Sequence, residues 1–109
     1  IPPPITAVRE QREDPRPANF ALAQNFPNPF NAATTIRFAL ADRAQIELSL
    51  YNLRGQRIAT LATGERSAGL YSFAWDGRDD NGHVLASGVY LYRLRAGQRT
   101  ETRKLTLLR

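Results

Sequence analysis

The stretch WDGRDDNGHVLASGVYLYRLR, from Trp75 to Arg95, decides the fold of this chain. Its first part is a dense cluster of turn-forming residues, namely Asp76, Gly77, Asp79, Asp80, Asn81 and Gly82. Asp and Asn bond their own backbone and Gly accepts positive φ, so this composition predicts a compact polar loop. Its second part, from Gly88 to Leu94, predicts a strand with tyrosines at alternate positions. The loop therefore joins two strands, either as a long hairpin or as a crossover between two packed sheets.

Alternation of apolar and polar residues continues on both sides of this stretch and predicts further strands. We expect a short extended piece over residues 20–24. Strands are expected over residues 34–40, 44–51, 56–61, 70–75 and 99–108. The short link Ala41–Arg43 predicts that the strands on either side of it form an antiparallel pair, and Thr63–Gly69 is expected to be a loop. With no helical pattern, the sequence predicts an all-β domain, an immunoglobulin-like β-sandwich of about seven antiparallel strands.

The first nineteen residues, IPPPITAVREQREDPRPAN, hold five of the seven prolines and many charges. Because Pro fixes φ and cannot donate to a ladder, residues 1–19 are predicted to be a Pro-rich linker from an upstream domain. Residues 20–109 then form the folded domain. No segment at the start has the pattern of a signal peptide, so we expect a C-terminal piece of a larger protein. With no Cys, the chain has neither disulfides nor thiolate sites.

The chain is basic, with a formal net charge of +5. Such a charge can indicate an acidic binding partner, or it can simply keep the protein soluble. The cations are scattered apart from one group near the C-terminus, made of Arg99, Arg103, Lys104 and Arg109. A specific role in binding nucleic acid needs a denser basic patch, so none is expected.

The sequence does not predict an enzyme or a cofactor. His83 is the one histidine, and its spacing supplies no partner that would make it a general base. Asp76, Asp79, Asp80 and Asn81 carry the oxygens that Ca²⁺ takes. Arg78 stands where a helix-loop-helix calcium site would have a ligand, so we favour the alternative that these side chains bond the backbone of their own loop.

Two aromatic features admit a structural and a binding interpretation. Tyr90 and Tyr92 are candidates for a carbohydrate-stacking platform, but their strand is apolar on both faces, which favours a place in the core. The run Asn25–Asn31 has two prolines and three asparagines and predicts a fixed bend. We expect Phe26 and Phe30 in this bend to point into the core.

Seven short motifs in a fixed order resemble one family over residues 20–109. They are LAQNFPNPFN (22–31), TIRF (35–38), LYNLRG (50–55), AGL (68–70), WDGRD (75–79), SGVYLYRL (87–94) and RKLTLL (103–108). Together they resemble the type A C-terminal sorting domain of type IX secretion. The same pattern is similar to the related immunoglobulin-like domain of flagellar hook-capping proteins. A hook-capping protein would continue with more flagellar sequence, so the end of this sequence at Arg109 favours sorting.

The resemblance implies a non-catalytic signal that directs an upstream cargo across the outer membrane to the cell surface. Its partners would be the type IX translocon, a surface sortase that cleaves before the domain, and anionic lipopolysaccharide for attachment. The residues that carry the resemblance to the sorting signal are Pro27, Asn28, Pro29, Phe30, Gly88, Val89, Tyr90, Tyr92, Lys104, Leu105, Leu107 and Leu108.

The last strand suggests how a receptor would recognise such a signal. An exposed terminal edge offers main-chain hydrogen bonds, and Arg103, Lys104 and Arg109 would steer it to an acidic groove. Lys104 on that edge would also guard against self-pairing. Two alternatives stay open: a retained cell-attachment or carbohydrate-binding module of a multidomain glycoside hydrolase, and an accessory sandwich that only stabilises its neighbour.

Overall fold

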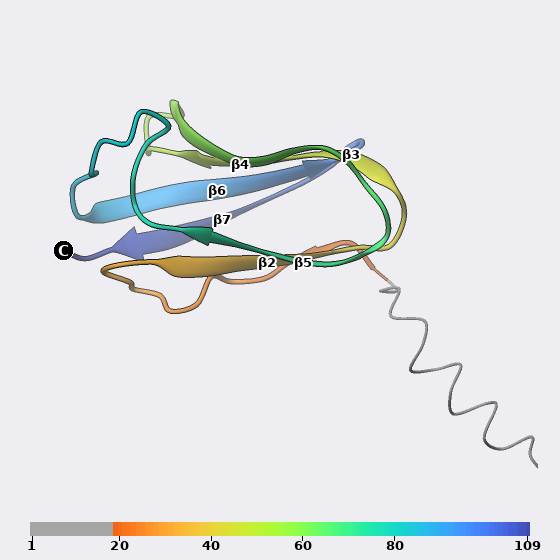
Figure 1. Cartoon of the computed structure of the whole chain (residues 1–109), viewed down its shortest axis with the longest axis horizontal. Coiled ribbons are helices and arrows are strands. Elements are labelled where there is room, and N and C mark those ends of the chain that lie inside the picture. The colour runs from red at the N-terminus through yellow and green to blue at the C-terminus, as the bar shows by residue number, and fades with distance from the viewer. Residues whose placement is uncertain (1–18) are drawn as a thin grey trace, which may run out of the picture.

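The computed structural model describes residues 19–109, which form two antiparallel sheets packed face to face (Figure 1). The three-stranded sheet has the order β1-β2-β5, and the four-stranded sheet has the order β4-β3-β6-β7. The predicted sandwich of seven strands is confirmed. The predicted linker lies outside the described residues except for Asn19. The strands are β1 (Ala21–Leu22), β2 (Thr34–Leu40), β3 (Ala44–Tyr51), β4 (Arg57–Arg66), β5 (Gly69–Trp75), β6 (Gly88–Ala96) and β7 (Arg99–Leu107).

The predicted pairing of β2 with β3 is wrong. β2 pairs with β5 in the three-stranded sheet, while β3 lies between β4 and β6 in the other sheet. The link Ala41–Arg43 therefore crosses from one sheet to the other. The physical reason is that β2 and β3 lie in opposite sheets and pack their apolar faces against each other across the core. Two sheets of a sandwich bury their inner faces in this way.

The segment Thr63–Gly69 is not a loop, which corrects a second prediction. β4 continues to Arg66 and stays paired with β3, and β5 begins at Gly69. The inward positions of β4 are filled by Ala59, Ala62 and Gly64, opposite large residues of β3. Because these residues are small, the segment lacks the apolar alternation that would have revealed the strand. The loop after Trp75 also crosses between sheets, which was one of the two predicted alternatives.

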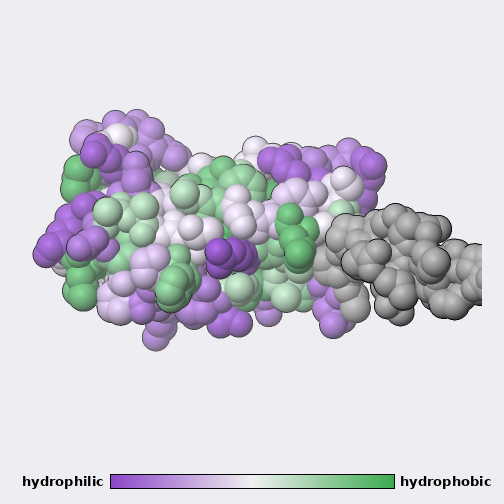
Figure 2. Space-filling view, turned by 60° about the horizontal axis from the view of Figure 1, so that its bottom comes forward, coloured by the Kyte–Doolittle hydropathy of each residue, from purple (hydrophilic) through white to green (hydrophobic). Residues whose placement is uncertain are grey.

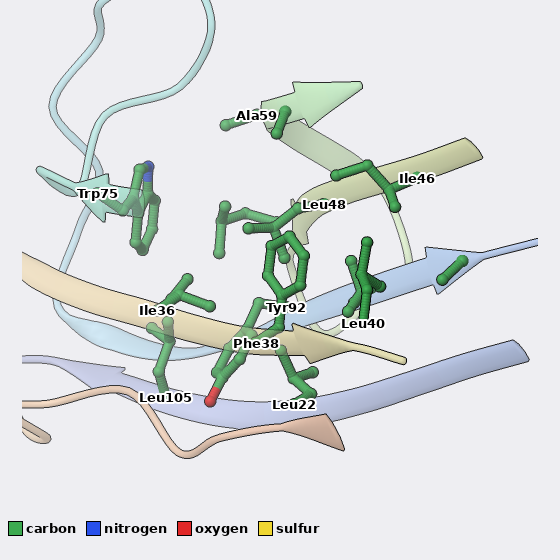
Figure 3. Close-up of a cluster of buried hydrophobic side chains, with 14 of the residues drawn as sticks. Leu22, Ile36, Phe38, Leu40, Ile46, Leu48, Ala59, Trp75, Tyr92 and Leu105 are labelled. Atoms are coloured by element: carbon green, nitrogen blue, oxygen red, sulfur yellow. The ribbon is translucent and has the colours of Figure 1, made fainter. Parts of the chain in front are cut away.

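The core lies between the sheets and is built from alternate positions of both (Figure 3). β2 contributes Ile36, Phe38 and Leu40, and they face a set from β3, β6 and β7 that comprises Ile46, Leu48, Leu50, Tyr92, Leu94, Leu105 and Leu107. Each fully buried Leu or Ile side chain stabilises the fold by roughly 1.5–3 kcal/mol. Residues 19–109 contain no helix of the length and apolar character that crossing a bilayer requires.

The aromatic predictions are confirmed in part. Tyr92 is fully buried, Tyr90 packs at the edge of the core against Trp75 at 5.9 Å between ring centroids, and Phe30 lies 5.7 Å from the same indole. Phe26, however, is 70% exposed, so its predicted place in the core is wrong. The neighbouring Asn25 takes the inward position of this extended segment, and the alternation of side chains then turns Phe26 outward.

Candidate functional site

The three segments that carry the resemblance are far apart in the sequence but meet at β7. On one side of β7 lies the start of β6, where Gly88 pairs with Leu107 and Tyr90 with Leu105. On the other side, Phe30 forms a parallel bridge with Leu107. The structure therefore brings together residues 27–30, 88–92 and 104–108, and β7 is the element that they share.

Residues 24–30, here named the strap, cover the outer edge of β7. The Phe30 N–H donates to the Thr106 carbonyl at 3.0 Å, and the Leu108 N–H donates to the Phe30 carbonyl at 2.8 Å. The Thr106 N–H donates to Asn28 Oδ1 at 2.9 Å, and Gln24 Nε2 donates to the Lys104 carbonyl at 2.7 Å. Four backbone groups that this half of β7 and Leu108 turn away from β6 are thus bonded to the strap.

Towards the start of β7, side chains tie it to β1 of the other sheet. The Leu22 N–H donates to Glu101 Oε1 at 2.8 Å, and Arg103 Nε donates to the Leu22 carbonyl at 2.6 Å. The exposed terminal edge expected from the sequence is therefore absent between Lys104 and Leu108, where the strap occupies it. The reason is that the strap, although irregular, runs beside β7 and satisfies its main-chain groups as a strand would.

A buried polar network positions the strap. The Tyr92 hydroxyl accepts from the Asn25 N–H at 2.8 Å and donates to the Ala23 carbonyl at 2.7 Å. Asn25 Nδ2 donates to Thr34 Oγ1 at 3.0 Å and to the Pro27 carbonyl at 3.2 Å, and Thr34 Oγ1 donates to that same carbonyl at 2.8 Å. Burial raises the pKa of the Tyr92 phenol above its ordinary value, so the hydroxyl keeps its proton.

Sequence reasoning missed Asn25 and Thr34 as members of this network. Both are buried, and polar side chains become buried only when they are hydrogen-bonded. The one local signal for a special role of Asn25 was its position immediately before the aromatic-proline pair Phe26–Pro27. Nothing in the local sequence, however, links this asparagine to Tyr92, which is 67 residues away.

Arg109 ties the end of β7 to the loop between β5 and β6. Its N–H donates to Ser87 Oγ at 2.8 Å, its Nε to the Leu85 carbonyl at 2.8 Å and its Nη2 to the Gly77 carbonyl at 2.9 Å. Gly77 has a φ of 77°, which favours glycine, and a Cβ at this position would displace the Arg109 guanidinium, whose Nη2 would lie 2.6 Å from it. Of the three cations predicted to steer a receptor, only Lys104 projects from the outer face of β7.

The carboxylates of the loop after Trp75 bond backbone amides, as the favoured prediction stated. Asp79 Oδ1 accepts from the N–H groups of Asn81 and His83 at 2.9 Å each, and Asp76 Oδ1 accepts from the Arg78 N–H at 3.2 Å. The hydrogen bond from the His83 N–H holds the pKa of Asp79 below its ordinary value. Within residues 19–109, no group of three or more His, Cys, Asp or Glu side chains is placed to hold a metal ion.

Asp80 bonds outside this loop and covers the outer edge of β4. Its Oδ1 accepts from the Thr60 N–H at 3.1 Å, and its own N–H donates to the Ile58 carbonyl at 3.0 Å. This loop therefore protects part of the second free edge of the four-stranded sheet.

Comparison with known proteins identifies the family. Residues 28–100 match the family model described as the FlgD Ig-like domain. The chain belongs to the FlgD Ig-like domain family. The matched range includes the strap from Asn28, the strands from β2 to β6 and the crossover loop. Among curated proteins, no sequence matches this FlgD Ig-like domain significantly.

Solved structures share the fold of this FlgD Ig-like domain. Latent PorU from Porphyromonas gingivalis superposes with a TM-score of 0.65 at 17% identity, over 84% of this chain and 10% of PorU. FlgD from Xanthomonas campestris superposes with a TM-score of 0.55 at 19% sequence identity, over 93% of this chain and 73% of FlgD. PorZ, a surface component of the type-IX secretion system of P. gingivalis, superposes with a TM-score of 0.51 at 18% sequence identity, over 84% of this chain and 12% of PorZ. This chain thus spans about a tenth of PorU, and identities this low establish the fold alone.

Exposed apolar side chains gather at the end of this FlgD Ig-like domain where β7 finishes, here named the strap pole. They are Phe26, Leu53, Val84, Val89 and Leu108. Two shallow depressions flank the strand end, one lined by the strap prolines and Leu108, the other by the β3–β4 turn and the start of β6. Hydrophobic residues are visible at this end, on the left of Figure 2. Exposed apolar residues at one end of a domain make that end a candidate for contact with a partner.

Proposed function

We propose that this FlgD Ig-like domain is a non-catalytic C-terminal sorting signal of type IX secretion, which directs an upstream cargo across the outer membrane to the cell surface. The observation that carries the proposal is the convergence of residues 27–30, 88–92 and 104–108 at one end of the sandwich. Among the seven motifs of the resemblance, these are the segments that hold the candidate residues of the sorting signal. The fold that this chain shares with PorZ, itself a surface component of that system, supports the proposal.

The partners of the domain would be the translocon and a surface sortase, with anionic lipopolysaccharide as the attachment target. The strap already bonds the outer edge of β7 between Lys104 and Leu108, so a receptor that added a strand there would first have to displace it. We therefore favour a receptor that reads the outside of the folded strap pole. Leu108, Val89 and Leu53 would then supply apolar contact area, whose removal from water favours association.

A secretion assay with a matched pair of leucine variants tests this proposal. A fluorescent reporter is fused ahead of residues 1–109 and expressed in a host with type IX secretion. Leu108 at the strap pole is 52% exposed, and Leu70 at the opposite end of the sandwich is 71% exposed. Leu108→Ser should leave the reporter in the periplasm, whereas Leu70→Ser should be exported like the unchanged fusion, because only the first removes apolar area from the strap pole.

Two outcomes would count against the proposal in different ways. If the unchanged fusion stays in the periplasm, the domain is no sorting signal for that system. If both leucine variants are exported equally well, the strap pole is not what the receptor reads. Deleting residues 103–109 is a poorer test, because the deletion also removes Leu105 and Leu107 from the core and would unfold the domain.

A further inference from the structure

The outer face of the four-stranded sheet carries more positive than negative charge. The pairing register places four cations on this face, namely Arg57, Arg93, Arg95 and Lys104. Its acidic side chains are Glu47, near the centre, and Glu65, at a corner, where Arg43 pairs with it at 3.6 Å. The excess of cations makes this face attractive to a polyanion.

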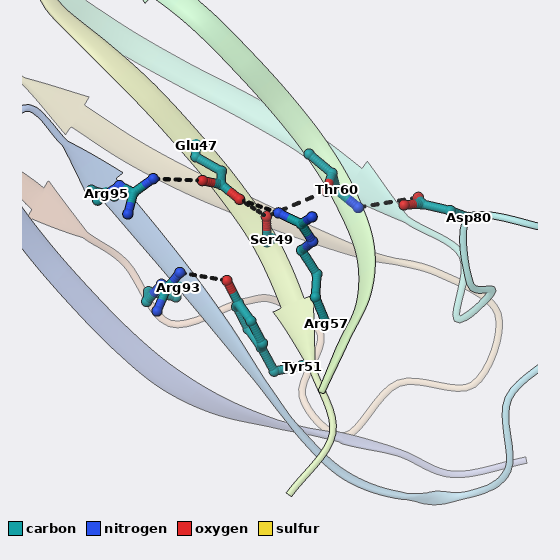
Figure 4. Close-up of polar contacts among 8 residues, drawn as sticks. All are labelled: Glu47, Ser49, Tyr51, Arg57, Thr60, Asp80, Arg93 and Arg95. Atoms are coloured by element: carbon teal, nitrogen blue, oxygen red, sulfur yellow. Dashed lines mark hydrogen bonds and ion pairs between the residues drawn. The ribbon is translucent and has the colours of Figure 1, made fainter. Parts of the chain in front are cut away.

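Glu47 holds two of these cations in fixed positions (Figure 4). Arg57 Nη1 lies 2.7 Å from Glu47 Oε2 and Arg95 Nη2 lies 2.9 Å from Oε1, while Ser49 Oγ donates to Oε2 at 3.1 Å. The hydrogen bond from Ser49, then Arg57 and Arg95, lower the pKa of Glu47, so it stays ionised. One carboxylate thus pairs with two guanidinium groups, so this cluster keeps a net positive charge.

Arg93 and Lys104 add charge that no carboxylate of residues 19–109 neutralises. The Arg93 guanidinium lies over the Tyr51 ring at 4.7 Å from the centroid, and its Nη2 donates to the Tyr51 hydroxyl. This contact fixes the guanidinium on the sheet. Arg93 pairs with Thr102, so Lys104 lies one diagonal step away on the neighbouring strand, a separation of about 7–8 Å.

Hydroxyl groups line the same face beside the cations. On β7 the outer positions are occupied in turn by Thr100, Thr102, Lys104 and Thr106. Side chains two residues apart on a strand are separated by roughly 6.8 Å, so the face presents a row of hydrogen-bonding groups along one direction. A flat row of hydroxyls and cations suits an extended polar polymer rather than a compact ligand.

We propose that this face binds an acidic polysaccharide, with Arg93 and Lys104 contacting its carboxylates and the β7 threonines contacting its sugar hydroxyls. Arginine and lysine bind carboxylates through charge-assisted hydrogen bonds. Single-stranded nucleic acid is the less suitable polyanion, because it needs aromatic faces on which bases stack. Tyr51 is the aromatic ring on this face, and Arg93 covers it. This binding does not depend on the export role.

Binding to polygalacturonate, measured by calorimetry with the whole chain, tests this inference. Neutral dextran of similar length and single-stranded DNA serve as comparison ligands. The chain should bind polygalacturonate at low salt and lose affinity as salt screens the charges. The double variant Arg93→Gln/Lys104→Gln should weaken binding by about tenfold or more. Arg37→Gln/Arg99→Gln removes the same charge from positions off this face and should weaken it by less than about twofold.

The results that would overturn the inference are specific. No binding to polygalacturonate, or equal losses in the two double variants, would mean that the face is not a site. Tighter binding of single-stranded DNA at equal ionic strength would assign the face to nucleic acid instead. Should Arg93→Gln/Lys104→Gln melt at a lower temperature, Lys104→Gln alone replaces it, since this side chain is exposed and makes no hydrogen bond or ion pair within residues 19–109. A loss no larger than that of Arg99→Gln would also overturn the inference.

Discussion

The two outer edges of the four-stranded sheet are closed in different ways. At the β7 edge, the strap makes two main-chain and two side-chain hydrogen bonds, and the buried network of Asn25, Thr34 and Tyr92 holds it in place. At the β4 edge, a single exposed residue, Asp80, bonds Ile58 and Thr60. Both devices cover unpaired strand groups, but only the first is coupled to the core. The β7 edge should therefore contribute more to the stability of the domain.

The largest effect is expected from Asn25→Ala. This change removes the hydrogen bonds from Asn25 Nδ2 to Thr34 Oγ1 and to the Pro27 carbonyl and empties the buried volume of the amide, although Thr34 Oγ1 still donates to that carbonyl. We expect the free energy of unfolding to fall by about 2–4 kcal/mol. Urea unfolding followed by tryptophan fluorescence measures this change, since Trp75 is buried in the core. A loss below about 1 kcal/mol would mean that the network does not hold the strap.

Tyr92→Phe should have the next largest effect. The ring stays in the core, but the Asn25 N–H and the Ala23 carbonyl lose the hydroxyl with which they pair. A cost of about 1–3 kcal/mol follows from leaving such groups unpaired. Amide hydrogen exchange should show faster exchange along the strap than along β3. Uniformly faster exchange would instead indicate a general loosening of the core.

Asn28→Ala and Asp80→Ala compare the two edges directly. Each removes one acceptor for an edge amide, that of Thr106 or that of Thr60, and each should cost about 0.5–1.5 kcal/mol. Because the two edges share no partner, the losses should add within about 0.5 kcal/mol in the double variant. A larger coupling, measured by urea unfolding of all four proteins, would show that the edges are not closed independently.

The smallest effect is a pH dependence from Asp79 in the loop that covers the β4 edge. The His83 N–H bond lowers the pKa of Asp79 from its ordinary value of 3.8. The stability that Asp79 contributes is therefore complete above that value and is lost as the pH falls through the lower folded pKa. Asp79→Asn keeps an acceptor oxygen but does not titrate, so its melting temperature should fall less between about pH 4 and 2. An unchanged acid slope would contradict this assignment.

The sequence predicted the positions of the strands far better than it predicted which strands pair with each other. β2 and β3 were found with their correct ends because their alternation is strict, and alternation reports which side chains point inward. It does not report which strand lies alongside, so the pairing across Ala41–Arg43 was wrong. β4 was cut short because alanine and glycine at its inward positions carry little hydrophobic signal.

The candidate site was predicted as a set of residues but not as an arrangement. The bend at Pro27–Phe30 and the last strand were each recognised, yet their contact joins segments that only the complete topology brings together. The contacts of Arg103 and Arg109 with backbone carbonyls were not predicted either. A local sequence shows the charge of an arginine but not the carbonyl that it will reach.

The strap and β7 have one further consequence, which concerns the order of synthesis. The bonds between residues 22–28 and residues 101–106 join groups that are 78 to 81 positions apart in the chain. Contacts of such separation form slowly and only after the intervening loop has been closed. As the ribosome adds residues in order, β1 can pair with β2 early, but the strap has no strand to bond until the last residues are made. Chains broken off before residue 101 therefore leave the strap without its partner, and cellular proteases can recognise them as unfinished.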